Sequence, residues 1–307
     1  MLQNIQILVS QIIVMFLLIG VGAFCYRKKY INDDGAGQLS FILTRIVAPC
    51  VVIDSFQREF DQALILSVLC TCTAMGLSIL VSHLIFRKNG SHANFADKRF
   101  CVVFTNCGFM GLPLLDALYG SEGLFLGSAF IMVNNLLLWT YGVGQLSRDV
   151  PRGERLLNTV YNPVVISNLI GLFCFLTPFK LPVVPATAVS YLASLNTPIA
   201  MIAVGAFLAQ CDLRECFRDT QVYFVSALRL LILPLITLAV FLLLPLDHTL
   251  RCSMLISAAA PVAMAASLFG KTYGTDYLFS TRATAVSTIF SALTIPAMVA
   301  LCQLLGG

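Results

Sequence analysis

The chain of 307 residues is 58% hydrophobic and only 11% charged, and its mean hydropathy is +0.88. Soluble domains carry about 25% charged residues, so this composition excludes an ordinary soluble protein and indicates a polytopic protein of the lipid bilayer. The formal net charge of +4 is small and predicts no affinity for nucleic acid.

Ten apolar segments are long enough to cross a bilayer as helices, which need about 20 residues each. The first has no basic segment before it and no cleavage site, so we expect a retained span and not a signal peptide. The connections are too short for a soluble domain. The sequence predicts an all-α membrane protein with spans at roughly 5–25, 36–56, 62–86, 100–119, 122–146, 161–178, 185–209, 220–244, 249–270 and 276–304.

Basic residues are distributed unevenly between the two sides of these spans. Of the 19 Lys and Arg residues, 13 lie in odd-numbered connections, three in even-numbered ones, and three within spans. Because cytoplasmic loops carry the excess of Lys and Arg, we expect the odd connections in the cytoplasm. Both termini are then predicted to lie on the outer side of the cytoplasmic (inner) membrane.

The most polar connection, 147–161, divides the chain into two sets of five spans, 1–150 and 151–307. An odd number of spans per half requires that the second half be inverted, as in many secondary transporters. Two proline pairs support a repeat: Pro113 and Pro261 are 148 residues apart, and Pro49 and Pro198 are 149 apart. Spans three and eight correspond less well, since Pro234 has no counterpart.

The fourth span contains the stretch Asn106-Cys107-Gly108-Phe109-Met110-Gly111-Leu112-Pro113. Pro113 leaves the carbonyl of Phe109 without its helical donor, and Pro261 in span nine does the same to Ser257. Irregular backbone at membrane depth persists only inside a protein or beside a water-filled cavity. We therefore expect both spans to be broken, with half-helix N-termini meeting at an anion site and freed carbonyls available to a cation or water. The alternative is a packing kink.

Polar side chains near these breaks are candidates for substrate contact. Asn106 precedes the first break, Asn134-Asn135 lies in span five, and Asn196 precedes Pro198. For each, the alternative is a hydrogen bond between helices with no ligand. The candidate substrate-binding residues are Asn106, Gly108, Gly111, Pro113, Asn135, Asn196, Ser257 and Pro261.

Charged residues within spans are candidates for ion coupling or charge relay, namely Asp54, Arg45 and Arg229. Arg45 is a candidate partner for a substrate carboxylate. Asp54 is either a proton or sodium relay or an interfacial carboxylate. No span has an acidic residue near its centre, so the coupling ion, H⁺ or Na⁺, is left open.

Motifs for enzymes, metals and cofactors are missing from the sequence. There is no HExxH, GxSxG, Walker lysine or GxGxxG motif, and the 11 cysteines match no metal-binding pattern. The only carboxylate pair for an intramembrane aspartyl enzyme is Asp54 with Asp116. We expect neither an enzyme nor a bound cofactor.

A set of motifs along nearly the whole chain resembles the auxin efflux carrier family of membrane transporters. The motifs are Asn106-x-Gly108-Phe109-Met110-Gly111-Leu112-Pro113-Leu114 in span four, Val133-Asn134-Asn135 leading to Trp139 in span five, Asn162-Pro163 in span six, Thr197-Pro198 leading to Gly205-Ala206 in span seven, Arg229-Leu230-x-x-x-Pro234 in span eight, and Ala260-Pro261-Val262-Ala263, Tyr273-Gly274-x-Asp276 and Thr294-x-Pro296 in the last two. The short central connection is similar to that of compact bacterial members, of the malate or malonate permease type.

The resemblance implies a fold similar to that of the bile-acid/sodium symporters, with broken spans four and nine crossing each other. It also implies a scaffold of spans 1, 2, 6 and 7, a transport domain of spans 3–5 and 8–10, a homodimer, and alternating-access transport of small organic anions such as dicarboxylates. One departure is that Met264-Ala265-Ala266 are apolar where many members carry a polar residue, so the second half contributes mainly backbone. Two alternatives are a sodium-coupled symporter of the bile-acid type and a non-transporting membrane sensor or assembly subunit.

Overall fold

The computed structural model describes residues 2–57, 61–86, 92–146, 161, 163–177, 179–211 and 213–306. Most of the predicted central connection, 147–160, and Asn162 of the predicted start of span six lie outside these residues. Within the described residues, all regular secondary structure is helical apart from one isolated β-bridge.

The helices of the first half and of the second half follow in chain order. Those of the first half are α1 (Leu2–Arg27), α2 (Asp33–Ile42), η1 (Leu43–Val47), α3 (Ala48–Ser55), α4 (Ala63–Ile85), α5 (His92–Val103), η2 (Cys107–Gly111), α6 (Leu112–Leu137), η3 (Leu138–Gly142) and α7 (Val143–Leu146), where η marks a π-helical turn. Those of the second half are α9 (Pro163–Leu176), α10 (Val183–Ser194), α11 (Asn196–Gln210), α12 (Leu213–Cys216), α13 (Thr220–Ala227), η4 (Leu228–Ile232), α14 (Leu233–Leu242), α15 (His248–Ala259), α16 (Ala265–Tyr273) and α17 (Tyr277–Leu305).

Seven helices of the described residues are long and apolar enough to cross a membrane, whereas the sequence predicts ten spans. The difference has three sources. Predicted span six is the 14-residue helix α9, span nine is divided into α15 and α16, and spans four and five share the apolar segment Cys107–Leu146.

The shared segment reverses direction at Gly120, inside α6. Gly120 has φ 56° and ψ −137°, which is not a helical conformation. A Cβ added to Gly123 would overlap the carbonyl of Leu115. Residues eight apart in a straight helix are about 12 Å apart, so this contact requires the chain to fold back. The reversal falls between predicted spans four and five.

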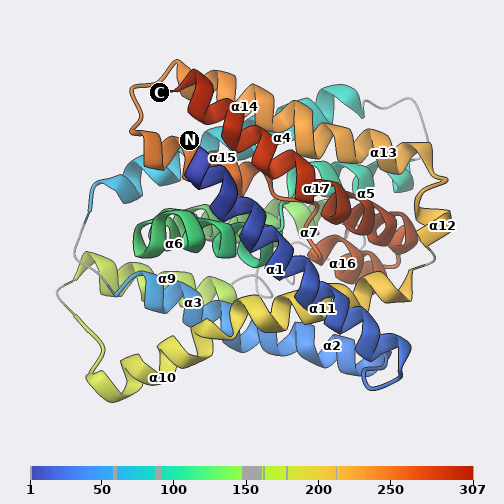
Figure 1. Ribbon diagram of the computed structural model, residues 1–307, viewed down its shortest axis with the longest axis horizontal. Coiled ribbons are helices and arrows are strands. Elements are labelled where there is room, and N and C mark those ends of the chain that lie inside the picture. Colours follow the sequence, from blue (N-terminus) through green and yellow to red (C-terminus); the bar gives the residue numbers. More distant parts are fainter. Residues whose placement is uncertain are drawn as a thin grey trace.

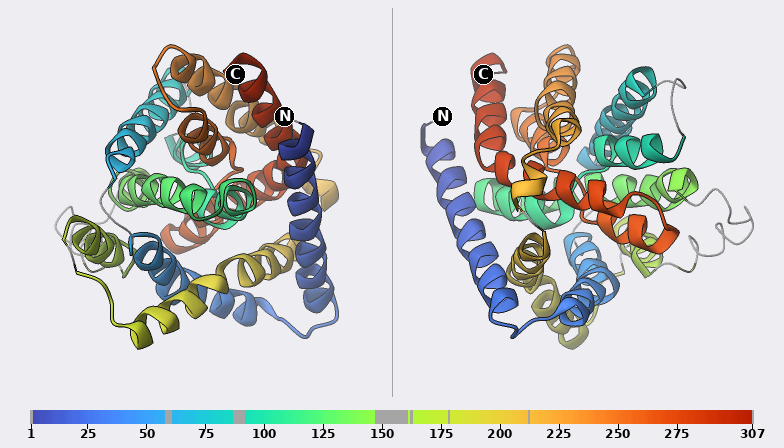
Figure 2. Two further views of the ribbon diagram at one scale, coloured as in Figure 1. Left: turned by 60° about the vertical axis from the view of Figure 1, so that its left-hand side comes forward. Right: turned by 90° about the vertical axis from the view of Figure 1, so that its right-hand side faces the viewer.

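Two groups of helices lie on opposite sides of α6 (Figure 1). One group contains α2, α3, α9, α10 and α11, and the other contains α4, α13, α14, α15 and α17. The two views of Figure 2 show the same separation and place the N- and C-termini near each other. The first group comes from predicted spans two, six and seven, and the second from spans three, eight, nine and ten.

Two glycines allow equivalent close contacts in the two halves. A Cβ on Gly22 of α1 would overlap the carbonyl of Ile202 in α11, and one on Gly171 of α9 would press on Val52 of α3 and on Phe56, which directly follows α3. Gly171 follows Gly22 by 149 residues, the same separation as Pro49 and Pro198. The first helix of each half therefore packs on a later helix of the other half: α1 packs on α11, and α9 packs on α3.

Three of the four π-helical turns within the described residues end immediately before a helical turn that contains proline. The residue preceding each of Pro49, Pro113 and Pro234 donates its N–H to the carbonyl five residues back instead of four. Proline lacks a donor and clashes with the carbonyl four residues back, and the wider turn relieves both problems. These helices therefore continue through their prolines.

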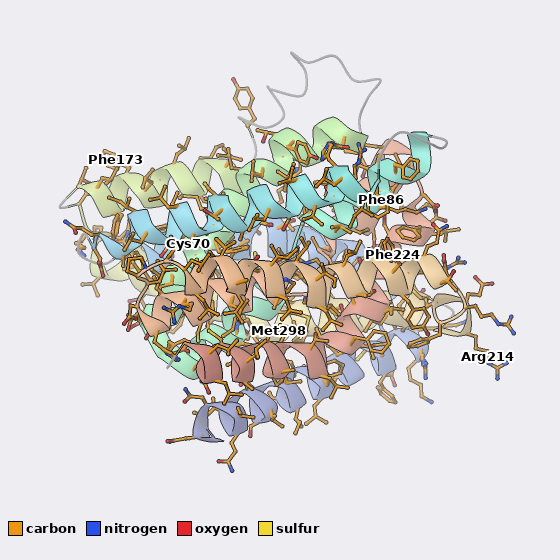
Figure 3. All side chains as sticks on the ribbon, turned by 90° about the horizontal axis from the view of Figure 1, so that it is seen from above. Cys70, Phe86, Phe173, Arg214, Phe224 and Met298 are labelled. Carbon is orange, nitrogen blue, oxygen red and sulfur yellow. The ribbon has the colours of Figure 1, made fainter. Side chains whose placement is uncertain are left out.

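Basic connections gather at the end of the molecule that lies opposite the two termini. The C-terminal end of α1, with α12 and α16, lies toward this end in Figure 1, and these segments carry Arg27, Arg214 and Lys271. Figure 3 shows Arg214 at this margin and Phe173 of α9 at the other. Phe173 is 59% exposed, as expected for an apolar side chain that faces lipid.

Candidate functional site

The two interrupted helices cross at the centre of the molecule and are joined through their backbones. Helix α5 ends at Val103 and α15 at Ala259, and the non-helical residues that follow pair as an antiparallel bridge between Thr105 and Val262. The N–H of Asn106 donates to the carbonyl of Pro261 at 2.8 Å, and the N–H of Ala263 donates to that of Phe104 at 3.1 Å. These two hydrogen bonds join the interrupted helices directly through their backbones.

The first interruption lies at 104–106 and not at Pro113, where the sequence predicts it. Pro113 instead lies buried in the first turn of α6, directly after the π-helical turn η2. The wider turn accommodates the proline, so the helix begins at Cys107 and is not broken at Phe109. Pro261 does lie in the second interruption, between α15 and α16.

The carbonyl of Ser257, which Pro261 deprives of its helical donor, is already bonded. The hydroxyl of Thr105 donates to it at 3.0 Å. The hydroxyl of Ser287 accepts the N–H of Val262 at 3.1 Å. Thr105 occupies one of the two lone pairs of the Ser257 carbonyl, and the expectation that this carbonyl also binds a cation or water stays a prediction.

A cavity of about 670 Å³ borders the crossing. Its wall includes the beginnings of η2 and α16, parts of η1 and α11, and one face of the α6–η3 helix. Helix N-termini expose unpaired N–H groups and a partial positive charge, which favour an anion. Polar residues of the wall are Ser40, Thr44, Arg45, Thr105, Asn106, Asn134, Asn135, Tyr161, Asn196, Ser267, Thr272, Tyr273, Thr281 and Thr284.

Arg45 is the single charged side chain among the described residues that line this cavity. It lies in the π-helical turn η1, and its guanidinium carbon is 6.0 Å from the ring centre of Phe41. A guanidinium forms paired hydrogen bonds with a carboxylate. The cavity is therefore electrostatically suited to an acidic ligand.

Two amide side chains near the crossing have different roles. Asn106 is 5% exposed, and its Nδ2 has no hydrogen-bond partner. Because a buried unpaired donor is costly, it is the best candidate for ligand contact. Asn196 instead donates from Nδ2 to the carbonyl of Gly108 at 3.0 Å, which leaves one of its N–H groups and its oxygen for other partners.

Span five contributes both of its asparagines and an aromatic residue. Asn135 is half-buried, while Asn134 is buried and its Oδ1 lies 3.5 Å from the N–H of Thr105. Trp139 packs edge-on against Phe269 of α16, with ring centres 4.8 Å apart. The aromatic contribution of α16 was not predicted, because spacing alone does not show which residues of the two halves meet.

The remaining candidates lie outside the cavity wall. Gly111, Pro113, Ser257 and Pro261 are buried in the packing around the crossing, and Asp54 is exposed on α3. Arg229 is buried and binds backbone carbonyls of α5 and of the α15 end. Of the predicted site residues, the cavity brings together Arg45, Asn106, Gly108, Asn135 and Asn196.

The second half supplies apolar residues directly after Pro261, and its polar wall residues lie elsewhere, on α11, α16 and α17 and at Tyr161. Ala263, Met264 and Ala265 line the cavity, and Ser267 is the first polar residue after them.

Among the described residues, no three His, Cys, Asp or Glu side chains lie together as a metal site would require.

Comparison with known proteins gives matches along almost the entire chain. The family model described as "Membrane transport protein" matches twice, over residues 7–153 and 152–299. An uncharacterized transporter of Methanothermobacter thermautotrophicus is 25% identical over 291 residues, covering 92% of this chain and 94% of that protein. YfdV, an uncharacterized transporter of Escherichia coli K12, is 23% identical over 301 residues and 93% of each chain. MJ1031, an uncharacterized transporter of Methanocaldococcus jannaschii, is 22% identical over 300 residues, 92% of this chain and 95% of its own.

Proposed function

Because this chain belongs to the membrane transport protein family, that of the auxin efflux carriers, we propose that it is a secondary active transporter of a small organic anion. It works by alternating access in the cytoplasmic membrane. The observation that carries this proposal is the cavity beside the crossing, where Arg45 is the single charged wall residue among those described and the Nδ2 of Asn106 is buried and unpaired.

The substrate is a carboxylate, and a dicarboxylate such as malate or malonate fits the wall best. Arg45 binds one carboxylate through its guanidinium, and the amide of Asn106 and the N-terminal end of η2 bind the other. The volume of about 670 Å³ is within the roughly 300–1,000 Å³ of small-molecule sites. Trp139 and Phe269 cover the carbon chain of the substrate.

The architecture we propose is ten spans in two inverted repeats, 1–150 and 151–307, with a bile-acid-symporter-like fold. Two observations support it: the family model matches the chain twice, and Gly22 and Gly171 make equivalent contacts. In this proposal the seven longer helices supply seven of the ten spans. The other three are the short helix α9, the interrupted pair α15 and α16, and the second half of α6, which is counted as a span of its own.

Alternating access follows from the two groups of helices. In the proposal, α1 joins the group α2, α3, α9, α10 and α11 as a scaffold, and the crossing helices move with the other group as a transport domain. The basic connections gather at one end of the molecule, which supports an orientation with the odd-numbered connections in the cytoplasm and both termini on the outer side. In a homodimer joined through the two scaffolds, the scaffolds would stay fixed while the two transport domains move.

Uptake into proteoliposomes tests the proposal. Purified protein reconstituted into vesicles should accumulate labelled malonate or malate in a saturable way, with empty vesicles as the control. Unlabelled dicarboxylates should compete, and the uncharged diamide malonamide should not. Competition by malonamide equal to that of malonate would contradict an anion site, and absence of flux for every organic acid tried would contradict transport itself. Parallel assays with a sodium gradient and a proton gradient identify the coupling ion.

A further inference from the structure

Arg229 does not line the cavity and is 1% exposed. It belongs to the π-helical turn η4, between α13 and α14. Its Nη1 donates to the carbonyls of Val102 and Val103, at 2.9 and 3.3 Å. Its Nε donates to the carbonyl of Ala260 at 3.2 Å, and its Nη2 donates to that of Ala258.

These four carbonyls belong to the C-terminal ends of the two interrupted helices. Val102 and Val103 end α5, Ala258 lies in the last turn of α15, and Ala260 follows it directly. The last carbonyls of a helix have no helical donor and carry a partial negative charge. Two such ends converge here inside the protein, so a positive charge at this point is strongly favoured.

In carriers with interrupted helices, unwound carbonyls and half-helix C-termini of this kind are ligands for a coupling Na⁺ or H⁺. Here a guanidinium occupies the position. Its planar fork of N–H donors serves several carbonyls at once and stays charged. Among the described residues, no carboxylate forms an ion pair with Arg229, so the carbonyls themselves compensate its charge.

We propose that the guanidinium of Arg229 is a fixed cation in the place of a coupling ion, so that no sodium ion binds at the crossing. Arg229 is then a positioning residue: it holds the ends of α5 and α15 together and so fixes the start of η2 at the cavity. The proposal rests on the proposed transport function and deepens it, because it excludes sodium coupling at this position.

Thermal unfolding of the purified protein tests this without any substrate. At equal ionic strength, the unfolding temperature of the wild type should be the same in sodium, potassium and choline chloride. Arg229→Ala should unfold at a lower temperature, and millimolar guanidinium or sodium should restore part of the loss. Phe241→Ala, at a fully buried position of α14, is the matched control and should not be restored.

A sodium-specific rise in the wild-type unfolding temperature would overturn the proposal. Equal responses of Arg229→Ala and Phe241→Ala to guanidinium and sodium would overturn it as well. If Arg229→Ala does not fold, Arg229→Lys and Arg229→Met decide the matter. Lys keeps the charge, so it should unfold at a higher temperature than Met, and the reverse order would contradict a role for the charge.

Transport assays separate this proposal from the transport function itself. Uptake of malonate that is equal in sodium and choline media supports both. Uptake that requires sodium leaves the transport function intact and overturns the fixed cation. A wild type that carries no organic acid, yet passes the unfolding tests, overturns the transport function alone.

Discussion

The side-chain amide of Asn196 donates to the backbone carbonyl of Gly108 across 3.0 Å. Asn196 begins α11, in the helix group that we propose as scaffold, and Gly108 lies in η2, at the crossing. This hydrogen bond therefore joins the two proposed domains beside the cavity. A relative movement of the domains has to break it, so it stabilises the observed conformation against the alternative one.

Asn196→Ala should shift the balance between these conformations. A hydrogen bond is worth about 1 kcal/mol net, which changes a two-state ratio by roughly fivefold. We expect faster amide hydrogen exchange across 107–111 and a small fall in the unfolding temperature. Ser194→Ala is the control, because the bond that Ser194 makes among the described residues is within its own helix, to the carbonyl of Tyr191. Unchanged exchange in Asn196→Ala would show that the contact does not restrain η2.

Arg45→Gln should transport much more slowly while the fold remains stable. Arg45 is exposed to the cavity, so its replacement should change the free energy of unfolding by no more than about 0.5 kcal/mol. A hydrogen bond to a charged group contributes about 1.5–3 kcal/mol, so kcat/KM for malonate should fall by roughly 10- to 100-fold. Arg282→Gln is the control, because Arg282 pairs with Glu215 at 2.6 Å outside the cavity wall. Equal losses in both variants would contradict the role of Arg45.

Asn106→Ala should reduce uptake strongly without lowering stability. In the structure the Nδ2 of Asn106 is buried and unpaired, which costs stability, so removing the amide should leave the unfolding temperature unchanged or raise it. The substrate loses a donor, and uptake should fall at least about 10-fold. Calorimetric binding of malonate and thermal unfolding together check both parts. A variant that unfolds earlier but transports normally would show that Asn106 is a packing residue.

Several features of the fold follow from the sequence because they depend on local chemistry. Proline spacing predicts that corresponding helices of the two halves are distorted, and the motif set predicts the family, which the comparison confirms. The place of the first interruption was predicted wrongly. Whether a proline breaks a helix or is accommodated by a π-helical turn depends on tertiary packing, and the Pro113 sequence itself does not distinguish the two outcomes.

The partners of charged and polar residues were not predictable from the sequence. Arg229 is recognisable as a charge within a span, which suggests a relay, but its partners are backbone carbonyls 127 and 29 residues away. Backbone partners leave no trace in side-chain patterns. The bond from Thr105 to the Ser257 carbonyl is hidden for the same reason, since only the crossing brings these residues together.

Gly22→Ala should destabilise the protein, whereas Gly20→Ala on the same helix should not. An added methyl group at Gly22 would overlap the carbonyl of Ile202, while nothing lies within 4 Å of a Cβ at Gly20. Overpacking costs about 1–3 kcal/mol, and backbone is less able to move aside than a side chain. Alanine at Gly20 should stabilise slightly, because glycine weakens a helix by up to about 1 kcal/mol. Thermal unfolding of both variants is the measurement.

If the two halves are equivalent, Gly171→Ala should lower the unfolding temperature in the same way, by pressing on Phe56 and Val52. Destabilisation by Gly20→Ala equal to that by Gly22→Ala would contradict the close contact of α1 with α11.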